Sequence, residues 1–258
     1  LKADNYLQAI CDAAVLGARW VLDFDADFRR RLLERDPATL AGWKRIAAHL
    51  RYFEEHPEWR DLRPYRGISV IQDADSGALV SGGILDMIAV KHTPLQVVPR
   101  RRLHGDALRG SGMVLNLEPA LLGPAHKEAL STFTGLTLTA PPEVKLPALH
   151  GDEITVNEAD VKEIDFMWRG ISWTITQQNL GAKLYHAAGM LSRLVADQDG
   201  KRVVLHLINY TNYPVETVTV RFPTTFRKAR LLTPEGGTPK DLDVYEVDQV
   251  TAVDLDQV

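Results

Sequence analysis

The sequence lacks several features that would each define a class of protein. Its 258 residues include a single cysteine, Cys11, so no disulfide can form within the chain. No apolar run reaches the ~18 residues that a membrane-spanning helix needs, so no membrane partner is expected. The formal net charge is −4, and the longest basic runs, Arg29–Arg31 and Arg100–Arg102, are short. Nucleic acid is not expected as a partner either, because its binding needs a basic face.

Several catalytic motifs are also absent. Cys11 lies in an apolar, helix-patterned stretch, whereas a glutaminase or thiol esterase needs its cysteine on a strand–turn–helix elbow. Gly110–Gly112 lacks the frame of a serine elbow, and Ser81–Gly83 lacks the full phosphate-loop pattern, so we expect it to cap a helix. The eight histidines show no metal-ligand spacing. We therefore expect neither a metal nor a cofactor.

The chain begins at Leu1 without methionine and without a signal peptide. We therefore expect a piece of a longer, soluble protein. The compartment stays open between the cytoplasm and a periplasmic or secreted location.

What is present is an ordinary globular composition, with 45% hydrophobic and 25% charged residues. Residues 1–63 form the first predicted segment. Its pattern predicts a helix over 4–17, a short strand over 18–22 and a long helix capped by Thr39. This is one strand-and-helix unit, whereas a closed barrel takes eight. The segment therefore resembles the last unit of a barrel.

A second segment, 64–143, follows a proline-bounded linker. Buried strands are predicted over 67–72, 95–99, 112–117 and 136–139, with helices beginning at Ser81 and spanning 124–133. Short strands that alternate with helices predict a parallel, doubly wound sheet.

The third segment, 144–258, reads as β-rich. Alternating apolar residues from Phe166 to Ile175, and again over 184–194 and 203–208, predict strands separated by turns. Such a series is typical of a small β-sandwich.

The sharpest local cluster of functional side chains lies after the first predicted strand, and it consists of Trp20, Asp23, Asp25 and Asp27. Carboxylates at a strand end are where α/β proteins build active sites. A calcium loop is disfavoured because Phe28 occupies the place that needs glycine. Two interpretations remain: a loop rim whose acids pair with Arg29–Arg31, or a sugar contact.

Glycoside hydrolysis usually needs two carboxylates ~5–9.5 Å apart. Sequence alone does not establish such a pair here, so the catalytic residues stay unknown. Glu118, which follows the third strand of the second segment, is a candidate by position only.

The order of these segments is similar to the C-terminal half of the β-galactosidases of glycoside hydrolase family 42. The stretches that carry the resemblance are Gly17–Leu22 before Trp43–Ala47, Tyr52–Glu58, and Val204–Tyr210 leading to Pro214-Val215 and Thr233–Glu235. The resemblance implies an α/β fold in three parts. A terminal β/α unit of a barrel precedes a flavodoxin- or glutamine-amidotransferase-like parallel sheet, and a small β-sandwich follows.

In that family the catalytic glutamates stand on earlier barrel strands, to which no residue here corresponds. The resemblance therefore implies a non-catalytic portion that serves scaffolding or subunit contact, with carbohydrate and a second copy of the chain as partners. Two alternatives stay open: a self-contained glycoside hydrolase built on the aspartate loop and the strand-end crevice, and an interaction module without enzymatic activity.

Overall fold

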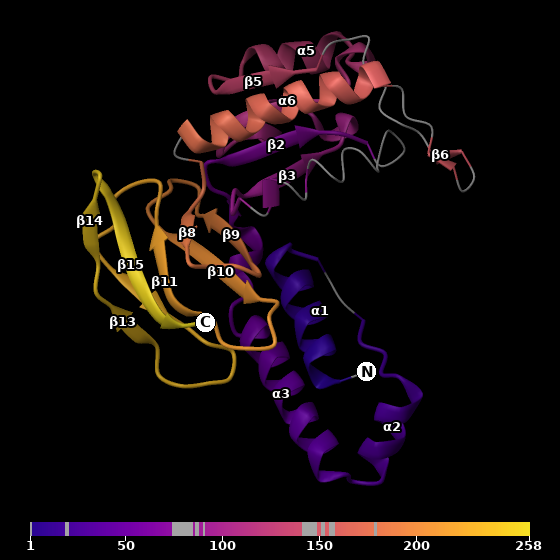
Figure 1. Ribbon diagram of the computed structural model, residues 1–258, viewed down its shortest axis with the longest axis vertical. Coiled ribbons are helices and arrows are strands. Elements are labelled where there is room, and N and C mark those ends of the chain that lie inside the picture. Colours follow the sequence, from indigo (N-terminus) through magenta and orange to yellow (C-terminus); the bar gives the residue numbers. More distant parts are fainter. Residues whose placement is uncertain are drawn as a thin grey trace.

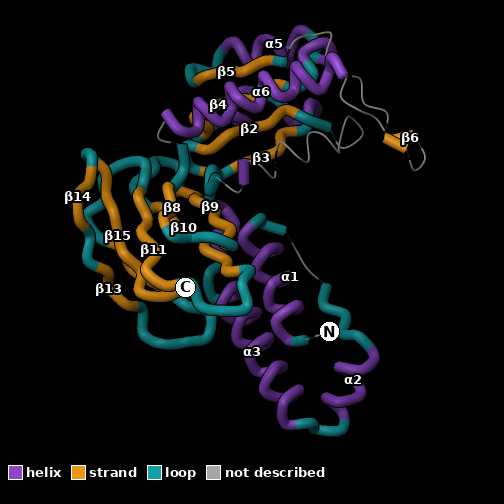
Figure 2. The backbone as a smooth tube through the Cα atoms, viewed as in Figure 1, coloured by secondary structure: helices purple, strands orange, loops and turns teal. Residues whose placement is uncertain are grey.

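The protein folds into three parts, which a computed structural model describes over residues 2–18, 21–73, 85, 88–89, 91–140, 149–150, 153–154, 158–177 and 180–258. Figure 1 shows the N-terminal helices, the parallel sheet with its helices and the C-terminal strands as separate layers. The backbone trace in Figure 2 shows the same division, with strands gathered in two of the three parts. Among the described helices, none combines the length and apolarity that crossing a bilayer requires.

The N-terminal part is helical. Helix α1 (Ala3–Val15) packs against α3 (Pro37–Glu54), with the shorter α2 (Ala26–Leu33) beside them and the 3-10 turn η1 (Pro57–Asp61) after them. Ile10 and Ile46, at 1% and 0% exposure, lie at the centre of this small core. Both are spaced from their apolar neighbours by helical periods, so the amphipathic pattern explains the packing.

The strand predicted over 18–22 is wrong for its described residues. Ala18, Val21 and Leu22 lie outside any strand, and Val21 is 97% exposed. A strand here would need a neighbouring sheet to satisfy its backbone groups, and no described strand pairs with it.

The start of α3 also differs by one turn from the prediction. Asp36, not Thr39, is the N-cap, and its carboxylate accepts hydrogen bonds from the backbone N–H and hydroxyl of Thr39 at 2.8 and 2.7 Å. Pro37 at the first helical position fits this start because its missing N–H would be unsatisfied there in any case.

The predicted parallel sheet is confirmed. It contains β2 (Gly67–Ile71), β3 (Leu95–Val98), β4 (Ser111–Asn116) and β5 (Leu136–Thr139), all parallel, in the order β3-β2-β4-β5. Of the helix predicted from Ser81, Leu85, Ile88 and Ala89 are helical, and Ser81–Gly83 lie outside the described residues.

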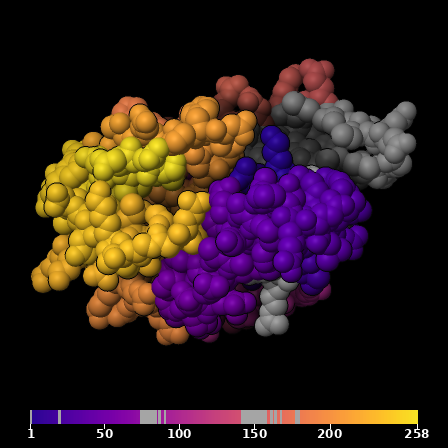
Figure 3. Space-filling view, turned by 90° about the horizontal axis from the view of Figure 1, so that it is seen from below, coloured from indigo at the N-terminus to yellow at the C-terminus, as the bar shows by residue number. Residues whose placement is uncertain are grey.

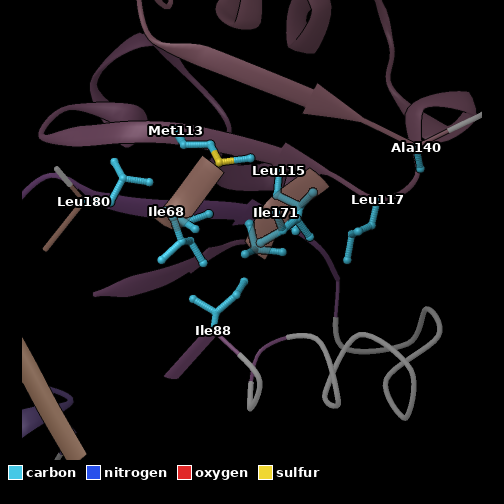
Figure 4. Packing of buried hydrophobic residues seen from close by; sticks show 10 residues of the cluster. Ile68, Ile88, Met113, Leu115, Leu117, Ala140, Ile171 and Leu180 are labelled. Carbon is cyan, nitrogen blue, oxygen red and sulfur yellow. The ribbon is translucent and has the colours of Figure 1, made fainter. Parts of the chain in front are cut away.

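Helices cover both faces of this sheet. On one face α5 (Pro124–Ser131) contributes Ala129 to a cluster with Ile71 and Val114. On the other, α6 (Glu158–Gln177) inserts Ile171 and Ile175 among Ile68 and Leu115. Figure 4 shows Ile171 facing the sheet residues Ile68, Met113 and Leu115.

Helix α6 corrects a second prediction, because Phe166–Ile175 is helical and not a series of strands. Ile171 and Ile175, four residues apart, face the sheet, whereas Phe166 and Trp173 are 73% and 65% exposed. Ile171, Trp173 and Ile175 alternate along the sequence and imitate a period of two, but burial follows the helical period instead.

The C-terminal part is built from antiparallel strands, as predicted. They are β1 (Arg63–Pro64), β8 (Lys183–Tyr185), β9 (Met190–Ala196), β10 (Val203–Asn209), β11 (Glu216–Arg221), β12 (Ala229–Leu231), β13 (Lys240–Leu242), β14 (Tyr245–Val247) and β15 (Val250–Gln257). They form sheets of order β1-β9-β10, β14-β15-β11-β8 and β12-β13. One apolar cluster, which includes Leu194 and Val218 at 0% exposure, lies between the two larger sheets.

The remaining short elements are η2 (Arg100–Arg102), η3 (Gly105–Leu108), η4 (Pro119–Leu121), β6 (Leu149–His150) and β7 (Glu153–Ile154). The segment boundaries at 63 and 143 stay predictions. Contacts cross both of them: β1 pairs with β9, and α6 packs on the parallel sheet.

Candidate functional site

The predicted aspartate cluster is divided among different local contacts. Trp20 lies outside the described residues. Asp23 is exposed, with one carboxylate oxygen 3.7 Å from Nη1 of Arg29. Asp27 pairs with Arg30 at 2.7 Å and with Arg31 at 3.0 Å. This is the pattern expected of loop acids paired with arginines, and a sugar contact stays a prediction.

Asp25 links two helices. It is the N-cap of α2, where Oδ1 accepts the backbone N–H of Phe28 at 3.0 Å. Its Oδ2 accepts the Tyr6 hydroxyl at 2.7 Å, and its own N–H donates to the Tyr6 oxygen at 2.9 Å. The hydrogen bonds from Tyr6 and Phe28 hold the pKa of Asp25 below its usual range. Both carboxylate oxygens therefore serve the junction of α1 and α2.

Over the described part of the chain, no group of three or more histidine, cysteine, aspartate or glutamate side chains could hold a metal ion. Cys11 lies half-buried on α1, and burial raises the pKa of its thiol to about 11. The thiol is therefore protonated near neutral pH, which disfavours a nucleophilic role.

A groove of about 580 Å³ lies elsewhere, between the last turns of α3 and the segment Leu231–Lys240 that joins β12 to β13. Figure 3 shows these helices and the C-terminal strands side by side on one face of the molecule. From the helical side, the groove is lined by Ala48, Arg51, Tyr52, Glu55 and His56. Its volume is in the range of small-molecule sites.

The ion pair of Arg45 with Glu235 links the segment Leu231–Lys240 to α3, and the same arginine pairs with Asp4 of α1. Arg45 donates from Nε and Nη2 to Glu235 at 3.2 and 3.1 Å, and from Nη1 to Asp4 at 2.8 Å. Gly236 and Gly237 adopt φ values of 92° and 123°, which favour glycine, and make the tight turn at the tip of the segment. All three charged partners are substantially exposed, so each pair contributes little on its own.

The lining of the groove is polar with one aromatic wall. Arg51 supplies donors and Glu55 supplies acceptors, one helical turn apart on α3. Burial raises the pKa of Tyr52 to about 12, so its hydroxyl stays protonated. Donors, acceptors and a ring in one groove suit a neutral ligand with several hydroxyl groups.

Four aromatic rings connect this groove to the C-terminal strands. His56 contacts Tyr52 with ring centroids 5.2 Å apart and stacks on Trp59 at 4.1 Å with a 4° interplanar angle. Trp59 in turn meets His206 of β10 edge to face at 5.2 Å. His56 lines both the groove and a second cavity of about 20 Å³ behind it.

The sequence did not predict this groove. The sequence analysis used Tyr52–Glu58 and Thr233–Glu235 only as stretches that carry the resemblance to family 42 β-galactosidases. The available signal was the spacing of Arg51, Tyr52 and Glu55 on one helix face, with a Gly-Gly turn far along the chain. Nothing in the sequence pairs these two segments, because their contact depends on how the three parts pack.

His206 makes folding sensitive to pH. Burial and the nearby charge of Arg193 lower the pKa of His206 from 6.5 to about 4. Below pH 6.5 the unfolded chain takes up the proton first, so stability falls as pH drops from 6.5 towards 4 and is unaffected by this group above 6.5. We expect His206→Gln to remove about 2–3 kcal/mol of that loss, measured by urea unfolding at pH 7.5 and 4.5. An unchanged difference between the two pH values would assign it to other groups.

A glycosidase acid needs a raised pKa. Hydrogen bonds to the charged form instead lower the pKa of four of them, Asp25, Asp36, Glu58 and Asp199. Burial pushes the pKa of Asp73 upward, but the hydrogen bonds and charge of Arg100 outweigh it, and the net shift is down. Glu118 lies half-buried just after β4.

No family model matches the sequence, and no curated protein matches it. A solved glycoside hydrolase structure does match the fold over the whole chain, so the fold is glycoside-hydrolase-like. That structure is the alpha-L-fucosidase isoenzyme 2 from Paenibacillus thiaminolyticus, with a TM-score of 0.63 and 10% sequence identity. The match covers 100% of this chain and 56% of the fucosidase, so the chain spans about half the length of that protein.

Proposed function

We propose that this chain is the C-terminal, non-catalytic part of a glycoside-hydrolase-like, carbohydrate-active protein. The observation that carries the proposal is the fold match, which covers the whole chain but 56% of a glycoside hydrolase. The strand order β3-β2-β4-β5 is also that of flavodoxin-type sheets, which supports an amidotransferase-like middle part on the plan of the family 42 β-galactosidases.

The placement of the carboxylates supports a non-catalytic role. In the groove, Glu235 is paired with Arg45 and contributes to holding the loop. In the N-terminal part, Asp25 caps a helix and Asp27 is paired with two arginines. A proton donor and a nucleophile for a glycosidic bond would therefore come from residues outside this set.

We propose two roles for the chain within such a protein. The groove between α3 and Leu231–Lys240 binds a neutral sugar, with the Tyr52 ring as a platform and Arg51 and Glu55 as hydrogen-bonding partners. The outer face of α6, where Phe166 and Trp173 are exposed, provides subunit contact. Asp23, Asp25 and Trp20 remain a second, proposed place for a sugar contact.

The sugar-binding role is tested by isothermal titration of the chain with neutral mono- and disaccharides. Tyr52→Ala removes the ring platform, so we expect about tenfold weaker binding, in line with the ~0.5–1.5 kcal/mol of an aromatic contact beyond its buried area. The matched control is Tyr213→Ala, which removes an exposed tyrosine outside the groove. Equal losses for the two variants, or no sugar binding by the unmodified chain, would refute the groove as a sugar site.

Aryl glycoside hydrolysis tests the non-catalytic assignment separately. We expect no turnover by the chain above the buffer rate. Turnover that disappears in Asp25→Ala or Glu55→Ala, while the variants stay folded, would instead establish the alternative of a self-contained hydrolase.

A further inference from the structure

The outer face of the sheet β14-β15-β11-β8 carries two partly exposed tyrosines. Val220 of β11 points into the apolar core of the C-terminal part, so its neighbours Thr219 and Arg221 point outward. Tyr185 of β8 is directly opposite Thr219 and shares this outer face. Tyr185 and Tyr245 are 39% and 42% exposed. The face therefore presents one aromatic side chain on each of its edge strands, β8 and β14.

The ring of Tyr245 lies along the sheet. Tyr245 is directly opposite Ala252 of β15, yet its hydroxyl donates to Oδ1 of Asp254 at 2.9 Å, two residues further along the same strand. The ring therefore leans diagonally across β15, whereas an unrestrained side chain would stand perpendicular to the sheet. Ala252 below it has 0% exposure. One face of the ring thus covers the sheet, and the other face is open to solvent.

The ring of Tyr185 is also fixed by a neighbour. Arg221 is diagonal to Tyr185 across the β8–β11 pair, and its guanidinium lies over the ring, 5.1 Å from the centroid. Such a cation–π contact takes up one face of the ring and restricts its motion. Arg221 is itself held by Asp248, which accepts from Nη1 at 3.0 Å. The second face of the Tyr185 ring remains for a ligand.

The residues between the two rings offer donors and acceptors. Thr219 donates its hydroxyl to Oδ1 of Asp254 at 2.7 Å, the same oxygen that accepts from Tyr245. No other residue in the described part of the chain donates to Oδ2 of Asp254, so this oxygen can accept from a ligand hydroxyl. The Thr219 oxygen keeps lone pairs as acceptors, and the Arg221 guanidinium adds N–H donors.

The composition of this face suits a sugar chain better than a protein or an ion. The centre of a protein interface is apolar, whereas between these tyrosines the described sheet has one apolar outward residue, the small Ala252. The charge of Arg221 is paired with Asp248, so no excess charge is offered to an ion. The apolar faces of sugar rings stack on aromatic rings while their hydroxyl groups form hydrogen bonds.

The spacing of the tyrosines sets a minimum length for the ligand. Two strands, β15 and β11, separate β14 from β8. At ~4.7–4.9 Å between neighbouring strands, the two tyrosines are about 14 Å apart across the sheet. A single sugar ring is too short to contact both.

We propose that this face binds an extended neutral glycan of several sugar units, with Tyr185 and Tyr245 as platforms and Thr219, Arg221 and Asp254 as hydrogen-bonding partners. The proposal rests on the carbohydrate-active role proposed above but concerns a separate surface, because none of the residues that line the groove belongs to this sheet. The face would keep the chain on a polysaccharide whether or not the groove is occupied.

Affinity gel electrophoresis tests the proposal with three soluble neutral polysaccharides: galactomannan, xyloglucan and hydroxyethyl cellulose. We expect at least one of them to retard the unmodified chain, and we expect acidic polygalacturonate not to do so. Tyr185→Ala and Tyr245→Ala should each weaken the binding about tenfold, with circular dichroism confirming that the variants are folded. Retardation by none of the neutral polymers, or stronger retardation by polygalacturonate, would overturn the proposal.

Matched variants separate this face from other surfaces. Tyr245→Phe keeps the ring and removes its hydrogen bond to Asp254, so it should weaken the binding less than Tyr245→Ala does. Tyr213→Ala changes an exposed tyrosine in the turn after β10 and should leave the retardation unchanged. Tyr52→Ala, in the groove, should also leave it unchanged.

The outcomes for the two sugar sites are distinguishable. If the groove fails to bind mono- and disaccharides while the polysaccharide retardation persists, only the groove is refuted. Retardation that disappears in Tyr52→Ala and persists in Tyr185→Ala and Tyr245→Ala would place the glycan in the groove and contradict the present proposal. Loss of self-association in the two sheet variants, with retardation unchanged, would show that a second copy of the chain covers this face instead.

Discussion

Replacing Ile171 with alanine should lower the free energy of unfolding by about 4 kcal/mol. Ile171 has 0% exposure and packs from α6 against Ile68 and Leu115 in the core of the parallel sheet. Truncation removes buried methyl groups and leaves a cavity that rigid strands cannot fill, which typically costs ~2–5 kcal/mol. Chemical denaturation monitored by circular dichroism measures the change.

Trp173→Ala is the matched control, two residues along the same helix. Two residues span about 200° on a helix, so Ile171 and Trp173 point to opposite sides. Trp173 is 65% exposed, and at dilutions where the chain is monomeric we expect its loss to change stability by no more than ~0.5 kcal/mol. In a strand the two side chains would share one face. Similar losses for both variants would therefore contradict the helical assignment of α6.

Replacing Gly67 with alanine should cost about 3 kcal/mol or more. A Cβ at position 67 would lie 2.2 Å from the carbonyl oxygen of Pro94 and 2.8 Å from its carbonyl carbon. That oxygen also accepts the N–H of Ile68 at 2.8 Å, which is where β2 and β3 begin to pair. Relief of the clash must move backbone, so overpacking and a strained hydrogen bond act together. Thermal and urea unfolding would both report the loss.

The control for this substitution is Gly105→Ala, at a glycine of η3 whose added Cβ would meet nothing within 4 Å. We expect a change within ~0.5 kcal/mol there. If Gly67→Ala were as mild as the control, the close approach of β2 to Pro94 would be wrong.

The parallel sheet could be predicted from the sequence because its central strands, β2 and β4, are largely buried on both faces, whereas the edge strands β3 and β5 are partly exposed. Gly67–Ile71 is buried at every position, and such continuous apolar runs between turn residues leave few alternatives. The antiparallel strands of the C-terminal part were also predictable, since turn signals separate their apolar residues.

Helix α6 and the first predicted strand could not be assigned correctly, because in both cases the structure depends on what the segment packs against, which local pattern does not show. Ile171, Trp173 and Ile175 alternate as in a strand, whereas Trp168, Ile171 and Ile175 follow the helical period, and only the position of the sheet decides which of them are buried. Ala18–Leu22 reads as a strand by propensity, but an isolated strand has no partner for its backbone groups.

The candidate groove was beyond sequence reasoning on physical grounds. Its two walls, α3 and Leu231–Lys240, meet only after the helices pack on the C-terminal strands. By contrast, the aspartate cluster was visible in the sequence. Whether its carboxylates cap a helix or contact a ligand is decided by geometry, which the sequence does not show. Asp25 accepts from Phe28 as a local N-cap, but it also accepts from Tyr6, nineteen residues away, a pairing that no local pattern reveals.

The pairing of β1 with β9 makes the whole parallel sheet an insertion in the sequence of the antiparallel C-terminal part. Arg63 and Pro64 form the edge of the sheet β1-β9-β10 opposite Ala196 and Val195, and every residue of β2 to α6 lies between these two points in the sequence. During synthesis β1 therefore has no partner until β9 has been made. The inserted parallel sheet can already pack against its own helices by then. Because closing a long loop costs little more entropy than closing a moderate one, the segment between β1 and β9 can change in length during evolution while the antiparallel strands on either side of it keep their pairing.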